Sequence, residues 1–308
     1  MAKTPASKQP PAKGSGGRPA GLFTWIAIAL VVVVVATLVI IKVTSGSSSN
    51  GTGGFQATDP TTAAQVTGVP AATFDAVAVK SPVAPVAPPI ALKGQPEFTA
   101  KSATGATLPE VFYLGAEYCP FCAAERWPLI VALGRFGTFT NLGNMESSTV
   151  SGEAYPGTPT FTFVKSTYTS KYLVFRGIEQ FTNVPDAATG FYTPLQNPNK
   201  TEEANFKKYD TSKWIPNISS NQNYSIPYLT IDNKFIVSGS SYNPATLANL
   251  TRSQIAQGLS DPTSPVTDAI VATANYLSAA ICVATKNQPG NVCSSAGVVA
   301  AKRAMGIK

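Results

Sequence analysis

The four cysteines of this 308-residue chain carry its clearest potential for chemistry, and two of them stand three positions apart. Cys119 and Cys122 enclose Pro-Phe at the start of an apolar run that favours a helix. A thiol just before the first helical turn lies among unpaired N–H groups at the positive end of the helix dipole, which favours its thiolate. A second thiol one turn further along can attack a mixed disulfide formed at the first. The spacing therefore predicts a redox-active dithiol.

A chance spacing and half of a zinc site are the alternative interpretations of this pair. A zinc site needs four ligands, usually in two close pairs. The other cysteines, Cys282 and Cys293, are eleven positions apart, and the sequence contains no histidine. The absence of histidine also excludes Ser-His and Cys-His catalytic pairs. The redox interpretation is therefore favoured, and neither a metal site nor an organic cofactor is expected.

Cys282 and Cys293 bracket a loop that contains Pro289-Gly290. An even number of cysteines outside the cytoplasm favours paired thiols. We expect a structural disulfide that ties a helix end to the C-terminal segment, in preference to a second redox pair.

The elements that must position the dithiol follow from the hydrophobic pattern. A short β-rich run, EVFYL, leads into Cys119, and a strongly apolar helix with an internal proline, Pro128, follows it. A hairpin turn at residues 232–233 joins two further strands, whereas residues 179–222 are polar and irregular. Strands are expected at residues 110–114, 159–164, 171–178, 228–231 and 234–238. Helices are expected at residues 120–136, 202–209, 243–258 and 265–284.

These residues resemble the thioredoxin superfamily. The resemblance rests on strand EVFYL, the Cys119-Pro120-Phe121-Cys122 motif at a helix start, and Ser225-Ile226-Pro227 before strand YLTI. It implies an α/β thioredoxin-like fold, a central mixed sheet flanked by helices, with Pro227 as a cis-proline that faces the dithiol and Ile226 before it. The stretches GAEYCPFCAAERW and ALGRFGTF also resemble an uncharacterised family of membrane-anchored thioredoxin-like proteins from archaea and actinobacteria. Pro-Phe between the cysteines is similar to the Pro-x pattern of DsbA-like oxidases and glutaredoxins, without the histidine of the DsbA-like proteins.

Several residues next to the motif could tune it. Glu125 could accept a proton from Cys122, and Arg126 could stabilise the thiolate or pair with Glu125. Glu117 could also accept this proton, although a solvated surface charge is the preferred interpretation. Tyr118 and Phe121 flank the cysteines and either form an apolar lip for an unfolded substrate or pack inside.

The N-terminal part predicts a membrane anchor. Residues 22–41 form an apolar run long enough to span a bilayer, and four positive charges precede it. We expect a basic cytoplasmic tail at 1–21, a transmembrane helix at 22–43 that is not cleaved, and a flexible, Pro-rich linker at 44–95. A thioredoxin-like domain at 96–260, with an insertion at 179–222, and a C-terminal helical extension at 261–308 complete the expected organisation.

The net charge of +7 arises mostly from the tail, because the first 50 residues hold five basic residues and no acid. Nucleic-acid binding is therefore not expected. The leading hypothesis is a single-pass membrane thiol–disulfide oxidoreductase with its main domain outside the cytoplasm. Its partners would be cysteines of exported proteins or a membrane redox protein. A non-catalytic adaptor with structural disulfides and a copper chaperone are the alternatives.

Overall fold

The computed structural model describes residues 55–81 and 85–307, which belong to one compact unit. The predicted tail and anchor, residues 1–43, and the first part of the predicted linker lie outside the described residues. Among those described, one helix, α7, is long and apolar enough to cross a membrane by length and composition, and 83% of its most apolar window is buried within the domain.

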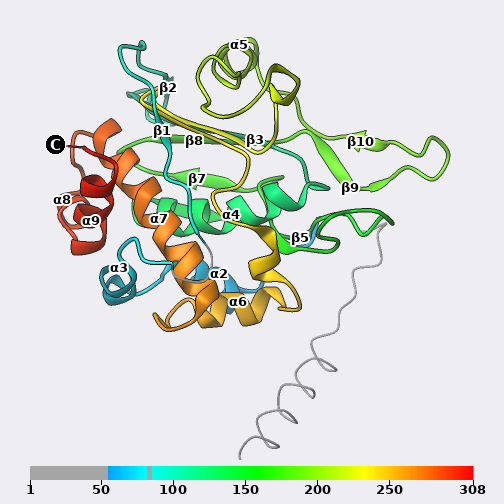
Figure 1. Cartoon of the computed structure of the whole chain (residues 1–308), viewed down its shortest axis with the longest axis horizontal. Coiled ribbons are helices and arrows are strands. Elements are labelled where there is room, and N and C mark those ends of the chain that lie inside the picture. Colours follow the sequence, from blue (N-terminus) through cyan, green and yellow to red (C-terminus); the bar gives the residue numbers. More distant parts are fainter. Residues whose placement is uncertain (1–54, 82–84, 308) are drawn as a thin grey trace, which may run out of the picture. The chain divides into compact units, whose positions relative to one another are not determined.

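A six-stranded mixed sheet forms the centre (Figure 1). Its central strand, β3 (Thr107–Gly115), pairs in parallel with β8 (Val174–Glu179) and antiparallel with β11 (Tyr228–Ile231). Beyond β11 follow β12 (Phe235–Ser238) and the two-residue strand β1 (Ile90–Ala91), while β2 (Thr99–Lys101) pairs with the beginning of β3. The expected strands at 110–114, 171–178, 228–231 and 234–238 are confirmed.

Alternation along β3 divides the core into two layers. Val111 and Tyr113 face a large apolar cluster, whereas Phe112 and Leu114 face a smaller one on the opposite side of the sheet. The large cluster contains the buried faces of α4 (Pro120–Leu133) and α7 (Pro265–Ala284), which pack against each other. The smaller cluster is covered by α5 (Lys200–Tyr209) (Figure 1). Both faces of the sheet are therefore covered, as the apolar composition of these strands requires.

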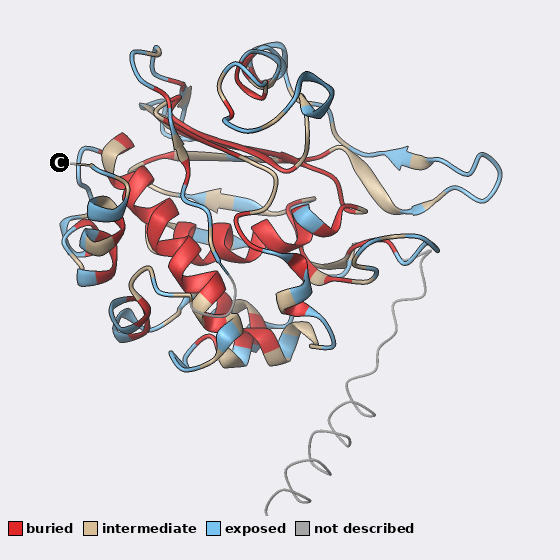
Figure 2. Cartoon of the chain, viewed as in Figure 1, coloured by how far each residue is buried: buried red, intermediate tan, exposed pale blue. Residues whose placement is uncertain are grey.

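Helix α4 begins directly after the first cysteine of the motif. Pro120 occupies its first turn, where a missing N–H costs nothing, and Pro128 lies inside the helix. Every residue of α4 except Phe121 is buried, as Figure 2 shows for the helix beneath the sheet. The expectation of a mostly covered helix that carries the dithiol is confirmed.

Residues 55–81 and 85–95 are not the flexible linker that their composition suggests. They form α2 (Pro60–Thr67), α3 (Ala71–Val77) and strand β1, and Val66, Phe74 and Val77 belong to the large core cluster. The side chain of Asn275 in α7 donates to the carbonyls of Phe74 and Ala78 at 2.9 and 2.8 Å. Burial of these apolar side chains explains why a segment rich in Ala, Thr and Pro is ordered.

Two other expectations need correction. The helix expected from 243 to 258 is two elements, η2 (Pro244–Leu247) and α6 (Arg252–Gly258). Asn249 between them has a φ of 62°, and Thr251 caps α6 with Gln254 in a capping box, so the chain restarts there. Helix α7, expected as part of an extension at 261–308, is instead a core helix packed on α4.

The segment 179–222 is more regular than expected. Strands β9 (Phe181–Pro185) and β10 (Tyr192–Pro194) form a hairpin that projects from the sheet (Figure 1). The helix expected near 202–209 is confirmed as α5, which an Asn199–Glu202 capping box starts.

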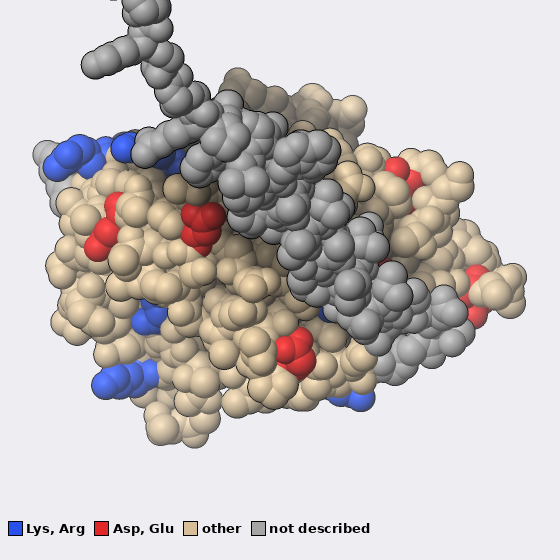
Figure 3. Space-filling view, turned by 90° about the horizontal axis from the view of Figure 1, so that it is seen from below, with Lys and Arg blue, Asp and Glu red and all other residues tan. Residues whose placement is uncertain are grey.

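The remaining strands form small two-stranded sheets, and the last helices close the domain. β4 (Thr138–Thr140) pairs with β7 (Thr167–Thr169), and β5 (Gly143–Glu146) pairs with β6 (Pro159–Thr162), which confirms the strand expected near 159. A short 3-10 turn, η1 (Ser220–Gln222), precedes β11, and α8 (Gly290–Cys293) and α9 (Ala296–Ala304) follow α7. On the face drawn in Figure 3, charged side chains are scattered among uncharged ones.

The disulfide between Cys282 and Cys293 is confirmed. Its Cα atoms lie 5.6 Å apart, within the range that a disulfide requires. It joins the last turn of α7 to α8, as expected for a structural bridge between a helix end and the C-terminal segment.

Candidate functional site

The two remaining cysteines are unpaired thiols. They lie in the dithiol turn, which runs from Ala116 after β3 to Cys122 in the first turn of α4. Cys119 is the N-cap of α4, and its Sγ accepts the N–H of Cys122 at 3.2 Å. Cys119 is 5% exposed and Cys122 is completely buried. The thiol that can meet a substrate is therefore Cys119, and Cys122 lies behind it.

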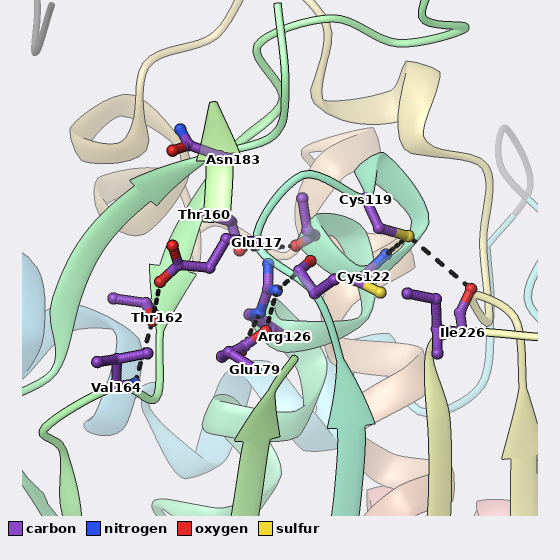
Figure 4. A network of polar contacts seen from close by, with 12 residues as sticks. Glu117, Cys119, Cys122, Arg126, Thr160, Thr162, Val164, Glu179, Asn183 and Ile226 are labelled. Carbon is purple, nitrogen blue, oxygen red and sulfur yellow. Dashed lines mark hydrogen bonds and ion pairs between the residues drawn. The ribbon is translucent and has the colours of Figure 1, made fainter. Parts of the chain in front are cut away.

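Ile226 and Pro227, directly before β11, lie next to Cys119. The Ile226–Pro227 peptide bond is cis, and the Cys119 thiol donates to the Ile226 carbonyl at a Sγ–O distance of 3.8 Å (Figure 4). Residues 107 positions apart thus meet at the dithiol. The cis bond at Pro227 and the contact of Ile226 with Cys119 are those that the thioredoxin resemblance implied.

The two thiols differ in their acidity. The hydrogen bond from Cys122 lowers the pKa of Cys119, and the charge of Arg126 acts in the same direction. Burial raises the pKa of Cys122 well above its usual range, and its hydrogen bond to Cys119 adds to this effect. A helix N-terminus favours a thiolate at its first position. Cys119 is therefore the more acidic thiol of the pair.

Arg126 lies on α4 one turn after Cys122 and forms a fully buried ion pair. Its Nε and Nη2 donate to the two carboxylate oxygens of Glu179 at 2.8 and 2.6 Å. Nη2 also donates to the carbonyl of Ala116 at 2.8 Å. The suggested pairing of Arg126 with Glu125 is wrong, because adjacent helical residues point to different faces.

Glu125 and Glu117 are both buried, contrary to the surface position preferred for Glu117. Glu125 accepts the backbone N–H and the hydroxyl of Ser241 at 2.7 and 3.1 Å, and burial raises its pKa to about 7. Glu117 accepts the hydroxyl of Thr162 at 2.7 Å, and burial raises its pKa to about 7 as well. Glu125 thus anchors the loop after β12 to α4, whereas Glu117 lies close enough to Arg126 and Glu179 for their charges to act on it.

The aromatic residues next to the cysteines form two clusters at the surface. Tyr118 stacks on Tyr192 of the β9–β10 hairpin, with ring centroids 4.4 Å apart. Phe121 is 40% exposed and meets the ring of Tyr155 edge-on at 5.8 Å. Tyr118 is therefore partly a packing residue, and Phe121 remains available for contact with another molecule.

A shallow groove of about 390 Å³ lies beside Phe121, between residues 85–87 and residues 240–243. Tyr242 in this groove donates its hydroxyl to the carbonyl of Ala124, one residue before Glu125. A larger depression of about 640 Å³ lies between α2 and α6, and its lining contains no cysteine. The groove beside Phe121 is thus the one connected with the dithiol turn.

Nothing in the sequence pointed directly to Glu179, Tyr113, Thr162 or Ser241 at this site. Glu179 reaches Arg126 because parallel pairing sets it opposite Gly115, just before the dithiol turn. The available signal was its position directly after the strand predicted at 171–178. Among the described residues, no group of three or more His, Cys, Asp or Glu side chains could hold a metal ion.

Fold and site define an α/β protein with a mixed sheet between helices and a vicinal thiol pair at the start of the central helix. The model of one family, a domain of unknown function designated DUF929, matches residues 100–283. This match covers more than half of the chain, so the chain belongs to that family. No curated protein and no solved structure matches the chain.

Proposed function

We propose that the chain is a thiol–disulfide oxidoreductase whose Cys119–Cys122 pair exchanges disulfides with cysteines of other polypeptides. The observation that carries this proposal is the placement of Cys119. It caps α4, accepts the N–H of Cys122, and lies opposite the cis Ile226–Pro227 bond, with Cys122 buried behind it. A loop of this length is too short to stabilise the fold much as a disulfide, so exchange chemistry is the better explanation.

The order of the elements supports a thioredoxin-like domain. A central strand leads into the dithiol and its helix, pairs in parallel with β8, and pairs antiparallel with the strand that follows Pro227. A hairpin partner, β12, then continues the sheet. These pairings support the thioredoxin-like fold that the sequence resemblance implies.

The exchange conserves atoms and electrons. The Cys119 thiolate attacks one sulfur of a substrate disulfide, a mixed disulfide forms, and the other substrate sulfur leaves as a thiolate. Cys122 then attacks Cys119 Sγ, the Cys119–Cys122 bond forms, and the second substrate sulfur leaves. Two electrons pass to the substrate, and the two thiol protons go to the leaving thiolates. The same steps in reverse oxidise a substrate dithiol.

Apolar side chains around the site indicate a polypeptide substrate. Next to the cysteines, Phe121 on α4 is 40% exposed. The β9–β10 hairpin, whose Tyr192 stacks on Tyr118, exposes Val184 and Phe191, and Leu195 is exposed just after it. A group of exposed large apolar side chains is typical of a surface for protein contact. Together with the predicted anchor at residues 22–41, they favour exported proteins or a membrane redox protein as partners.

Trapping tests this proposal. With Cys122→Ser in the full chain, mixed disulfides through Cys119 should accumulate, visible as thiol-sensitive bands in non-reducing gels of the membrane fraction. Cys119→Ser is the matched control and should give none. If Cys122→Ser traps no more partners than Cys119→Ser, the exchange function is wrong and a non-catalytic role or metal transfer takes its place.

A further inference from the structure

The second step of the proposed exchange poses an electrostatic problem. Cys122 is completely buried, and burial raises the pKa of its thiol well above the usual range. The sequence contains no histidine that could stabilise its thiolate. The attack of Cys122 on a mixed disulfide therefore needs another group that stabilises negative charge on its sulfur.

Arg126 is placed where it can stabilise negative charge on the Cys122 sulfur. Residues four apart lie on the same helix face, so Arg126 stands one turn below Cys122. Its guanidinium is completely buried, and Glu179 holds two of its nitrogens in a bidentate ion pair. The carbonyl of Ala116 accepts from both Arg126 Nη2, at 2.8 Å, and the Cys119 N–H, at 3.3 Å. The guanidinium is thus attached to the turn that carries the dithiol (Figure 4).

Two buried donors near the thiols have no partner among the described residues. They are the third nitrogen of the guanidinium, Arg126 Nη1, and the hydroxyl of Tyr113. The Arg126 Cζ lies 5.8 Å from the centre of the Tyr113 ring. A Cβ on Gly115 would lie 2.3 Å from the Tyr113 hydroxyl oxygen, so this hydroxyl reaches the strand end just before the dithiol turn. A buried donor without a partner is unfavourable, and a negatively charged group that forms next to it during the reaction relieves this cost.

The charged and titratable groups around Arg126 come from three directions. Glu179 approaches from β8, Tyr113 from β3, and Glu117 from the turn after β3, while both cysteines belong to the same helix end. Glu179 compensates the charge of Arg126 in the resting state. Since Arg126 remains charged at any pH at which proteins fold, its effect on the thiols does not titrate.

We propose that Arg126 is the positioning residue of the resolving step: held by Glu179, it stabilises through its unpartnered edge the negative charge that develops on Cys122 Sγ. This inference rests on the proposed exchange function. In the step, the Cys122–Cys119 bond forms, the bond between Cys119 and the substrate sulfur breaks, and the Cys122 proton passes to the leaving sulfur. The alternative is an ion pair that only joins β8 to α4.

The two steps can be timed separately with 5,5′-dithiobis(2-nitrobenzoate) and the reduced full chain in mild detergent. Attack by Cys119 releases one thionitrobenzoate, and resolution by Cys122 releases the second. The test variant is Arg126→Met with Glu179→Gln, which removes both buried charges together and avoids an unpaired carboxylate. The control is Arg176→Met with Glu202→Gln, which removes an ion pair of 2.9 Å between β8 and α5.

We expect the test variant to slow the second release at pH 7 about tenfold or more and to move its pH profile up by about one unit. The first release should change less, and the control pair should leave both unchanged. Arg126→Lys, which keeps the charge and loses the bidentate geometry, should give an intermediate second phase. An unchanged rate and pH profile of the second release would overturn the proposal.

The wild-type chain tests the proposal even if the double variant does not fold. Once Cys119 is part of the mixed disulfide, its charge and hydrogen bond no longer raise the pKa of Cys122. With Arg126 in this role, the second release should therefore reach half of its maximum rate below about pH 9.5, within about one unit of the pKa of an ordinary cysteine. A midpoint above about pH 9.5 would contradict it. If the wild type releases no second thionitrobenzoate at any pH, the exchange function itself fails, which is a different result from an unshifted profile.

Discussion

Phe74→Ala should strongly destabilise the domain, although the sequence suggests that this residue lies in a linker. Phe74 is 2% exposed in the large core cluster, and the guanidinium carbon of Arg135 lies 4.0 Å above its ring. Truncation of a buried Phe to Ala costs about 3–5 kcal/mol, and the lost contact with a desolvated cation belongs to the upper part of that range. We therefore expect a loss of about 4 kcal/mol in the free energy of unfolding.

Urea unfolding of the full chain in mild detergent measures this loss. With a slope of about 2–3 kcal/mol per molar urea, the midpoint should fall by roughly 1.3–2 M. Phe191→Ala is the matched control, because this residue is 77% exposed at the tip of the β9–β10 hairpin and its loss should cost under about 0.5 kcal/mol. Equal midpoints for the two variants would refute the packing of residues 55–81 on the domain.

Three further changes probe other parts of the structure. Replacing Cys282 and Cys293 together by Ser opens a loop of eleven positions and should lower the free energy of unfolding by about 2.8 kcal/mol in a denaturant titration. Thionitrobenzoate release by Cys119 and Cys122 should persist in this variant. Burial raises the pKa of Glu125 to about 7, against 4.5 for the free group. Its contribution to the free energy of unfolding is therefore complete below pH 4.5 and is lost as the pH rises through 7. Glu125→Gln should abolish about 3 kcal/mol of this pH dependence, which unfolding at pH 4 and pH 8 measures. Gly115→Ala would bring a Cβ within 2.3 Å of the Tyr113 hydroxyl oxygen and should cost about 1–3 kcal/mol, part of which Tyr113→Phe in the same chain recovers in thermal unfolding.

The elements that carry the dithiol could be predicted because their signals are local. An apolar β-rich run, a Pro directly after Cys119 and a long apolar stretch define β3 and α4, and both were expected at these positions. Helix α7 was expected with the same ends, since Pro265 marks its first turn and the apolar run continues to Ala284. Long segments with one strong pattern are readable without tertiary information.

The N-terminal helices could not be predicted in this way. α2 and α3 have eight and seven residues, too few to be stable alone, and their sequences read as a linker. Contacts of Val66, Phe74 and Val77 with the large core cluster hold them in place. That contribution comes from residues far away in the chain and leaves no local pattern.

The side-chain partners of the site residues also could not be predicted from the sequence, because the register of strand pairing decides which residues meet. Arg126 and Glu179 are 53 positions apart and meet only through the parallel pairing of β3 with β8. Their adjacency in the sequence suggested Glu125 as the partner of Arg126, but the Glu125 carboxylate accepts the N–H of Ser241 instead. The break between η2 and α6 was missed, although the capping-box pattern of Thr251 and Gln254 marks the restart in the sequence.

The reduction potential of the Cys119–Cys122 pair tests the central claim most directly. The oxidised full chain would be equilibrated with glutathione buffers of defined ratio, and Cys119 labelled with iodoacetamide and quantified by mass spectrometry. Exchange chemistry predicts a potential above about −300 mV and a Cys119 that reacts once the pair is reduced. A potential below about −300 mV together with an inert Cys119 would contradict the account and make the pair a structural disulfide.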